Sequence, residues 1–467
     1  MDQLEPGSPL YNMPAALRLE GTLDVRALEA AFDALVRRHE ALRTTFAVRD
    51  NEPVQLIHPT SGFSLPLLDL GTLPADERET RARLLVNEEA SRPFNLATGP
   101  LLRASLLRLD ASEHVLLVTL HHIVSDGWSM DVLVRELAAL YVANTSGTEA
   151  QLPALPVQYA DFSAWQRSWL RGDVLQRQLG FWKQQLSGAP PVLELPTDRP
   201  RPAVQSHRGA LLPVHLSAEL AESLAALAQR EGATPFMALL AIFQALLARY
   251  SGQGDISVGS PIAGRNRGET EGLIGFFVNT LVLRNQVSSE ATFRQLLAQV
   301  RASTLAAYEH QDVPFEKLVE ELQPQRSLSH SPLFQVMLIL QNTPQQSLEL
   351  GRGQEGIAPL KLSQLEAEGL AAQFDLTLSL SQTPRGLEGT FSYSTDLFDA
   401  PTVARIAHNL AVLLRDAVAH PDARLGDLAL LTGDERERVL RQWNDTTRAY
   451  DSACLHQQFE AQVARTP

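Results

Sequence analysis

The sequence predicts a mixed α/β or α+β fold in two lobes, and three observations carry this expectation. Strand-like stretches rich in β-branched residues alternate with segments whose apolar residues recur at helical spacing. The chain has 467 residues, which is more than one ordinary hydrophobic core accommodates. Prolines crowd residues 189–202, where neither a helix nor a central strand can continue, so we place the boundary between the lobes near there.

The first half shows strand and helix signals in turn. Residues 15–20 predict a short strand, and Asp24 is placed to cap a helix whose apolar residues span 28–35. Residues 115–120 are apolar and partly β-branched, which is typical of a buried strand, and helical spacing resumes shortly after them. Residues 121–129 therefore lie at a predicted junction between a strand and a helix.

The second half repeats this mixture. Thr234 and Pro235 favour the start of a helix over residues 236–247, which Gln244 interrupts and which is shorter than the roughly 20 residues that span a bilayer. Further strands and helices are predicted at residues 255–258, 293–308, 334–340, 376–380 and 403–413.

Composition narrows the classes of function. The formal net charge is −14 and no long run of Lys and Arg occurs, so we expect no nucleic-acid partner. A single cysteine, Cys454, rules out an intrachain disulfide framework and a multi-cysteine metal site. The first residues form neither a basic leader nor an apolar stretch, so we expect a cytoplasmic protein without a membrane segment.

The segment over residues 121–129, HHIVSDGWS, is the strongest candidate for chemistry. Imidazole accepts or orients a proton near neutral pH, and a strand end projects it into a cleft. Neighbouring strand side chains point to opposite faces, so we expect only one of His121 and His122 to enter a cavity, and spacing alone does not choose between them. Two histidines that merely satisfy buried hydrogen bonds are the alternative interpretation. Their divergence and the lack of a third clustered imidazole disfavour a metal site.

A G-x-G-x-x-G match at residues 351–356 is the one pattern that points to a dinucleotide. Pro359 follows within three residues, and no amphipathic helix or distal acidic ribose ligand stands in the expected context. The match therefore indicates a surface loop, and we expect no intrinsically bound cofactor.

HHIVSDGWS resembles the HHxxxDG signature of condensation domains of nonribosomal peptide synthetases, in which the second histidine is the key residue. The resemblance makes His122 the catalytic candidate. Four further segments match the family in order: RHEALRTTF at 38–46, YADFSAW at 159–165, IGFFVNT at 274–280 with Arg284, and HQDVPF at 310–315.

The resemblance covers nearly the whole chain and implies two lobes, each similar to chloramphenicol acetyltransferase, forming a V-shaped pseudo-dimer around a central tunnel. It implies that Asp126 pairs with Arg43 and holds the active-site loop, which His121 also supports. Gly127 keeps the donor-side pantetheine passage open because it lacks a side chain. Asn279 lies near the active centre or, alternatively, serves as a structural bridge.

The same resemblance divides the chain into a first lobe over residues 1–185, a second lobe with crossover segments over 186–430, a linker over 431–454, and the start of an adenylation domain over 455–467. The family's leading SxAQxRLW-type segment is absent, so we expect an N-terminal piece to be missing. The chain then resembles a fragment of a longer synthetase, next to an adenylation domain.

The implied activity is peptide-bond formation between two aminoacyl thioesters on phosphopantetheine arms of upstream and downstream carrier proteins. The motif wording most resembles the subtype that joins an L-configured donor to an L-configured acceptor. An epimerization-type sister domain and a non-catalytic docking module of the same fold are the alternatives. A heterocyclization domain is disfavoured by the intact histidine pair, and a coenzyme A acyltransferase by the adenylation-like tail.

Overall fold

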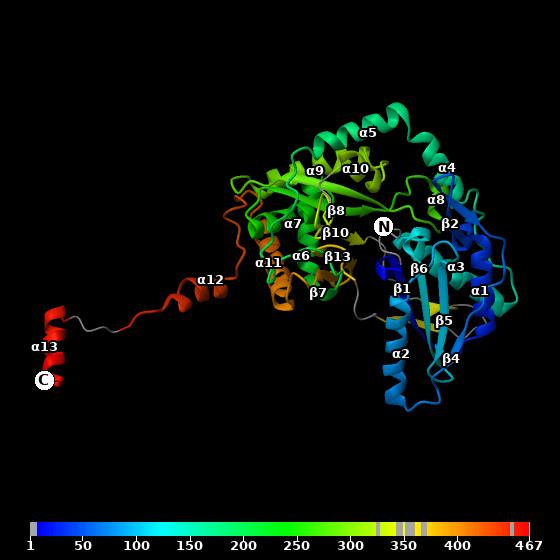
Figure 1. Ribbon diagram of the computed structural model, residues 1–467, viewed down its shortest axis with the longest axis horizontal. Coiled ribbons are helices and arrows are strands. Elements are labelled where there is room, and N and C mark those ends of the chain that lie inside the picture. Colours follow the sequence, from blue (N-terminus) through cyan, green and yellow to red (C-terminus); the bar gives the residue numbers. More distant parts are fainter. Residues whose placement is uncertain are drawn as a thin grey trace.

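The computed structural model describes residues 7–323, 327–341, 349–350, 360–365, 371–448 and 453–466. Two lobes lie side by side, and α4 (Tyr159–Trp169) and α5 (Gly172–Gln185) connect them along one edge of the molecule (Figure 1). Among the described residues each lobe contains a six-stranded sheet, so the predicted mixed fold is confirmed.

The first lobe has the strand order β11-β12-β1-β6-β5-β4. Its strands are β1 (Asn12–Glu20), β4 (Leu67–Asp69), β5 (Leu102–Arg108), β6 (Glu113–His121), β11 (Glu349–Leu350) and β12 (Leu360–Leu365). Apolar side chains of α1 (Val25–Arg38) and α3 (Gly127–Ser146) pack on one face of this sheet, and those of α2 (Ala75–Ser91) on the other. Asp24 accepts from the backbone N–H of Ala27 at 3.0 Å, which confirms the predicted cap of α1.

The second lobe has the strand order β7-β14-β13-β10-β8-β9. Its strands are β7 (Gly209–Ser217), β8 (Asp255–Ile262), β9 (Asn279–Gln286), β10 (Val336–Gln341), β13 (Leu376–Thr383) and β14 (Gly386–Ser394). Its helices are α6 (Ala218–Arg230), α7 (Pro235–Ser251), α9 (Phe293–Glu309), α10 (Phe315–Leu322) and α11 (Ala400–Ala419). Thr234 caps α7 through the backbone N–H of Met237 at 3.2 Å, as predicted.

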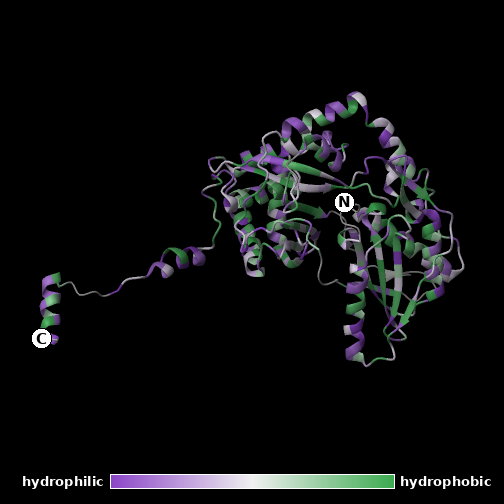
Figure 2. Ribbon diagram, viewed as in Figure 1, coloured by the Kyte–Doolittle hydropathy of each residue, from purple (hydrophilic) through white to green (hydrophobic). Residues whose placement is uncertain are grey.

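The predicted apolar helix is the centre of the second core. Every residue of α7 from position 237 to 247 is buried, and this includes Gln244, whose amide donates to the backbone oxygen of Leu283 at 2.9 Å. Within the described residues no single helix is long and apolar enough to cross a bilayer, and α6 and α7 meet that test only as a pair bent by 105°. Figure 2 shows hydrophobic residues concentrated in the strands of both lobes.

Smaller elements complete the chain. They are η1 (Pro9–Tyr11), η2 (Glu40–Arg43), the hairpin of β2 (Thr44–Arg49) and β3 (Glu52–Ile57), η3 (His122–Val124), α8 (Gly268–Glu271), α12 (Gly433–Leu440), η4 (Gln442–Asn444) and α13 (Leu455–Arg465). Thr432 and Glu435 form a capping box at the start of α12. The segment with α12 and α13 runs away from the second lobe (Figure 1).

Two segments from the second half of the chain cross into the first lobe. One is β12, which pairs antiparallel with β1 so that Leu362 lies opposite Leu19. The other precedes β9, and its Ile274 is 1% exposed within the core that α1, α3 and the first sheet form. The two lobes are therefore tied together at the place where the histidine pair lies.

Candidate active site

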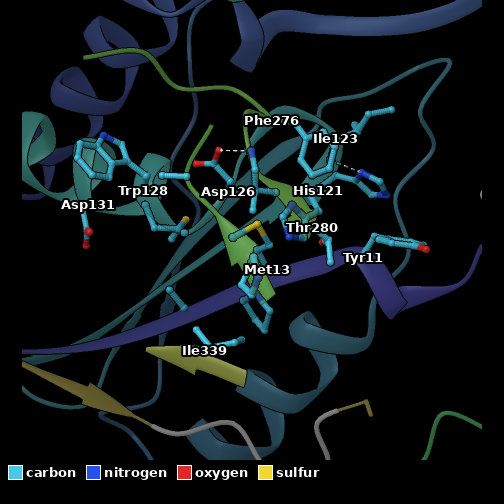
Figure 3. A pocket seen from close by; sticks show the side chains of 18 of the residues that line it. Tyr11, Met13, His121, Ile123, Asp126, Trp128, Asp131, Phe276, Thr280 and Ile339 are labelled. Atoms are coloured by element: carbon cyan, nitrogen blue, oxygen red, sulfur yellow. Dashed lines mark hydrogen bonds between the residues drawn. The ribbon is translucent and has the colours of Figure 1, made fainter. Parts of the chain in front are cut away.

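A cavity of about 2540 Å³ lies between the two lobes, and we call it the interlobe cavity. The first lobe contributes His121, His122, Asp126, Gly127 and residues of α3 and β1, and the second lobe contributes Phe276, Val278, Thr280 and residues of β8 and β10. Figure 3 shows Met13, His121, Phe276 and Thr280 gathered around its centre. The sequence segment singled out above therefore faces an interior space built by both lobes.

His122 is held in one tautomer by its own turn. It is the first residue of η3, directly after β6, and its Nδ1 lies 2.8 Å from the backbone oxygen of Ser125. A carbonyl oxygen only accepts, so Nδ1 carries a hydrogen, and in the neutral imidazole Nε2 keeps its lone pair. In the part of the chain that the structure describes, Nε2 has no hydrogen-bond partner, and the ring stands edge-on to Phe276 at 5.2 Å between centroids. The imidazole is oriented with a free acceptor nitrogen.

His121 is held differently. Its Nδ1 accepts from the backbone N–H of Ile123 at 3.1 Å (Figure 3). Its ring packs edge-on against Phe94 at 5.8 Å between centroids. The side chain is buried, whereas that of His122 is partly exposed. Both rings nevertheless line the interlobe cavity, so the expectation that only one of them would reach it is wrong. The physical reason is that β6 ends at His121, and the strand alternation does not extend to His122.

Asp126 is the most densely bonded side chain of the site. One carboxylate oxygen accepts from the backbone N–H and the hydroxyl of Ser129, at 2.8 and 2.7 Å, which caps α3. The same oxygen lies 3.1 Å from Nη2 of Arg265. The other accepts from the backbone N–H groups of Phe277 and Val278, at 2.9 and 3.2 Å. One carboxylate thus joins the histidine loop to the crossing segment of the second half.

The ion-pair partner of Asp126 differs from the expected one. We expected Arg43, and this expectation is wrong, because the partner is Arg265. Arg43 instead donates to the backbone oxygen of His58 at 2.6 Å and to Glu40 at 3.3 Å. It is the last residue of η2, and these local contacts hold it against the β2–β3 hairpin. Arg43 therefore supports the neighbouring hairpin and not the histidine loop.

Arg265 is the site residue that sequence reasoning missed. Its side chain is 1% exposed, and Nη1 donates to the backbone oxygens of Thr270 and Leu273 at 2.5 and 2.8 Å. Its guanidinium also lies over the ring of Phe277, 4.1 Å from the centroid. Burial lowers the pKa of Arg265 from the ordinary arginine value, and the charge of Asp126 opposes that shift. Arg265 lies between β8 and α8, where no periodic pattern of residues assigned it a partner.

The crossing segment fits tightly against α4. The hydroxyl of Tyr159 donates to the backbone oxygen of Phe276 at 2.9 Å, and burial raises the pKa of Tyr159 to about 12. A Cβ at position 275 would lie 2.3 Å from Cδ2 of Tyr159, so only glycine fits there. The YADFSAW and IGFFVNT segments thus meet in space, which fixes Phe276 against His122.

Gly127 and Trp128 form the first turn of α3. A Cβ added to Gly127 would meet no heavy atom within 4 Å, and the residue borders the interlobe cavity. The indole N–H of Trp128 donates to the backbone oxygen of Glu271 at 2.8 Å, and its ring lies 5.9 Å from the guanidinium of Arg265. The glycine leaves open space, whereas the tryptophan packs onto the crossing segment.

Asn279 acts as a bridge in the structure. Its amide donates to the backbone oxygens of Gln311 and Val313, both at 2.8 Å, and its oxygen accepts from the backbone N–H of Phe315 at 2.9 Å. These contacts hold the HQDVPF segment at the start of α10. Both polar atoms of Asn279 are thereby committed to backbone partners, which fits the structural-bridge alternative.

Two further expectations concern metals and cofactors. Within the described ranges no three His, Cys, Asp or Glu side chains are grouped so that they could hold a metal ion. The G-x-G-x-x-G match at residues 351–356 lies outside the described residues.

Comparison with known proteins gives consistent matches. The condensation domain family model matches residues 1–440. A linear gramicidin synthase polypeptide of Brevibacillus parabrevis is 53% identical over 466 residues, covering 100% of this chain and 6% of that protein. The chain therefore spans a small fraction of the length of this curated relative.

Two solved structures share the fold. One is holo-AB3403, a four-domain nonribosomal peptide synthetase bound to AMP and glycine, with a TM-score of 0.84 at 25% identity. The match covers 99% of this chain and 35% of the AB3403 chain. The X-domain in its complex with OxyB from teicoplanin biosynthesis has a TM-score of 0.80 at 32% identity, over 92% of this chain and 93% of that one.

Proposed function

Because the chain belongs to the condensation domain family of nonribosomal peptide synthetases, we propose that it forms a peptide bond between two carrier-bound aminoacyl thioesters. The observation that carries the proposal is His122, whose ring lines the interlobe cavity and whose Nδ1 is held by Ser125, which leaves Nε2 as the acceptor. A free acceptor nitrogen is what an attacking amine requires.

In the proposed reaction the amine of the downstream aminoacyl group attacks the carbonyl carbon of the upstream thioester. A C–N bond forms, the C–S bond breaks, and the thiol of the upstream phosphopantetheine arm leaves with the proton that the amine gives up. His122 Nε2 accepts the hydrogen of the amine and passes the proton on. Holding both arms in one cavity removes much of the entropic barrier.

The other residues position His122 and leave room for the substrates. Asp126 and Arg265 fix the loop of His122 against the crossing segment, and Phe276 limits the rotation of its ring. Gly127 leaves room for a phosphopantetheine arm at the edge of the cavity. The partners we propose are an upstream and a downstream carrier protein and an adjacent adenylation domain, with L-configured donor and acceptor.

A second candidate function is a docking module without catalysis. The X-domain, which is 32% identical to this chain, occurs in a complex with OxyB, so the fold also recruits another protein. Intact His122 with a free acceptor nitrogen favours catalysis, because a docking surface has no use for that arrangement. An epimerization-type domain remains the catalytic alternative.

One experiment separates the three functions. Two carrier proteins are loaded with an L-aminoacyl donor and a different L-aminoacyl acceptor, and the chain is added in deuterated water. The intact masses of both carriers report transfer of the aminoacyl group. The mass and the chiral analysis of the released amino acids report inversion at the α-carbon. The matched control is His122→Ala, and its folding is checked by its unfolding midpoint.

Dipeptide on the acceptor carrier, present with the natural chain and absent with His122→Ala, supports condensation. Deuterium at the α-carbon with inverted configuration and no dipeptide indicates epimerization. Unchanged carriers with a folded chain contradict both activities and favour the docking function.

A further inference from the structure

We propose that an apolar branch behind one wall of the interlobe cavity takes the aliphatic side chain of an aminoacyl thioester. This inference rests on the proposed function, since it names the class of substrate that the same cavity selects. The wall is formed by α3, β1 and β12.

A small second cavity lies behind this wall. It measures about 30 Å³, and its lining consists of Leu23 and side chains of α1, α3, β1, β6 and β12. The residues that line both this cavity and the interlobe cavity are Ala15, Leu17, Met130, Val134, Ala138 and Leu362. The two spaces are therefore separated by single side chains, and we call the second one the apolar branch.

The helix α3 presents a continuous stripe to both spaces. Met130, Val134 and Ala138 recur at a spacing of four residues, so they lie on one face of the helix, one turn beyond Gly127. The opposite side is β1, where Ala15 and Leu17 are two residues apart and share one face of the strand. A group that enters near His122 can thus extend along α3 toward the branch.

The chemistry of the branch admits only apolar groups. Its lining residues are aliphatic or methionine except for Tyr141, whose hydroxyl already accepts from the backbone N–H of Asp24 at 3.1 Å. No charged residue lines it among those described. A polar or charged side chain would lose its hydration there without gaining a partner.

The size of the branch indicates how it is used. The branch is small, at about 30 Å³, and close-packed protein interiors keep few voids larger than a water molecule. Met130 is partly exposed between the two cavities, and its unbranched side chain has three rotatable bonds. A rotation of Met130 would join the void to the interlobe cavity and make room for a side chain of valine or leucine size.

The test varies the substrate side chain and the branch together. In the first series, donor carriers loaded with Ala, Val, Leu or Asp are paired with one acceptor. In the second series, the same four amino acids are loaded on the acceptor carrier and paired with one donor. Rates are compared for the natural chain, for Ala138→Phe, which fills the branch, and for Ala263→Phe, which adds the same bulk on the second-lobe side of the cavity.

The natural chain is expected to turn over the Leu-loaded or Val-loaded carrier at least about tenfold faster than the Asp-loaded one, on one of the two sides only. Ala138→Phe should remove the advantage of Leu over Ala on that side, and Ala263→Phe should change all rates by a common factor. Equal effects of both variants on all side chains would overturn the proposal.

A binding measurement keeps this result distinct from the proposed activity. Pantetheine that carries leucine or alanine through a stable amide is titrated into the natural chain and into Ala138→Phe by calorimetry. Tighter binding of the leucine analogue, by about tenfold and with a more negative heat-capacity change, which Ala138→Phe abolishes, supports the branch even if no dipeptide forms. Equal binding of both analogues to the natural chain contradicts it.

Discussion

The ion pair between Asp126 and Arg265 gives the sharpest prediction about the architecture of the site. The change is Arg265→Met, which keeps much of the length of the side chain and removes its charge. In the folded chain both side chains are nearly inaccessible, at 2% and 1% exposed, so the carboxylate of Asp126 would stay buried without its counter-ion. Breaking a buried pair from one side costs about 3–5 kcal/mol.

The variant loses more than the charge pair. Arg265 also donates to the backbone oxygens of Thr270 and Leu273, which then lack these donors. The matched control is Arg43→Met, because the family resemblance implied the same partner for Arg43. Its side chain is 19% exposed and donates to His58 and Glu40, so we expect a loss of about 1 kcal/mol.

The assay is equilibrium unfolding in urea, followed by tryptophan fluorescence, on both arginine variants with and without Asp126→Asn. We predict a coupling energy of about 1.5–3 kcal/mol between Arg265 and Asp126, and one near zero between Arg43 and Asp126. A larger coupling of Asp126 to Arg43 than to Arg265 would contradict the ion pair seen in the structure and restore the pairing with Arg43.

Three further predictions concern the surroundings of the pair. Gly127→Leu should leave the free energy of unfolding within about 0.5 kcal/mol, because its Cβ meets open space, and should lower carrier-to-carrier transfer, as urea unfolding and intact mass would show. Gly275→Ala should lower the free energy of unfolding by about 1–3 kcal/mol, because the added Cβ clashes with Tyr159. Its control is Gly268→Ala, whose Cβ meets no heavy atom within 4 Å and which should lower the free energy of unfolding by less than half as much in the same assay. Tyr159 has its pKa raised from about 10 to about 12, so its contribution to stability is complete below pH 10 and is lost between pH 10 and 12. The stability difference between the natural chain and Tyr159→Phe, measured by urea unfolding at several pH values, should therefore shrink over that range, and a constant difference would contradict the assignment.

Local signals in the sequence predicted local structure well. Asp24 and Thr234 cap α1 and α7 as their positions before apolar stretches indicated, since capping depends on residues three apart. The junction at residues 121–129 was predicted because the residues before it are typical of a strand and those after it of a helix. That both His121 and His122 line the interlobe cavity was not predicted, because it depends on the exact residue at which β6 ends.

Contacts between distant parts of the chain could not be predicted in the same way. The sequence offers several arginines that could pair with Asp126. Choosing Arg265 among them requires knowing that residues 264–278 cross into the first lobe. The strand β12 carries only six residues of mixed burial, with a weak alternation, and its place beside β1 follows from the path of the chain between the lobes. Sequence patterns fix neither pairing, because both depend on tertiary packing.

In the proposed reaction, His122 acts through its free Nε2 in the transfer itself. The most direct measurement is the single-turnover rate of dipeptide formation by the natural chain, by His122→Ala and by His58→Ala, a histidine outside the interlobe cavity. We predict that His122→Ala lowers the rate by about 100-fold or more while its unfolding midpoint stays unchanged, and that His58→Ala keeps the rate within a few-fold. A folded His122→Ala chain that retains more than about a tenth of the natural rate would contradict the claim.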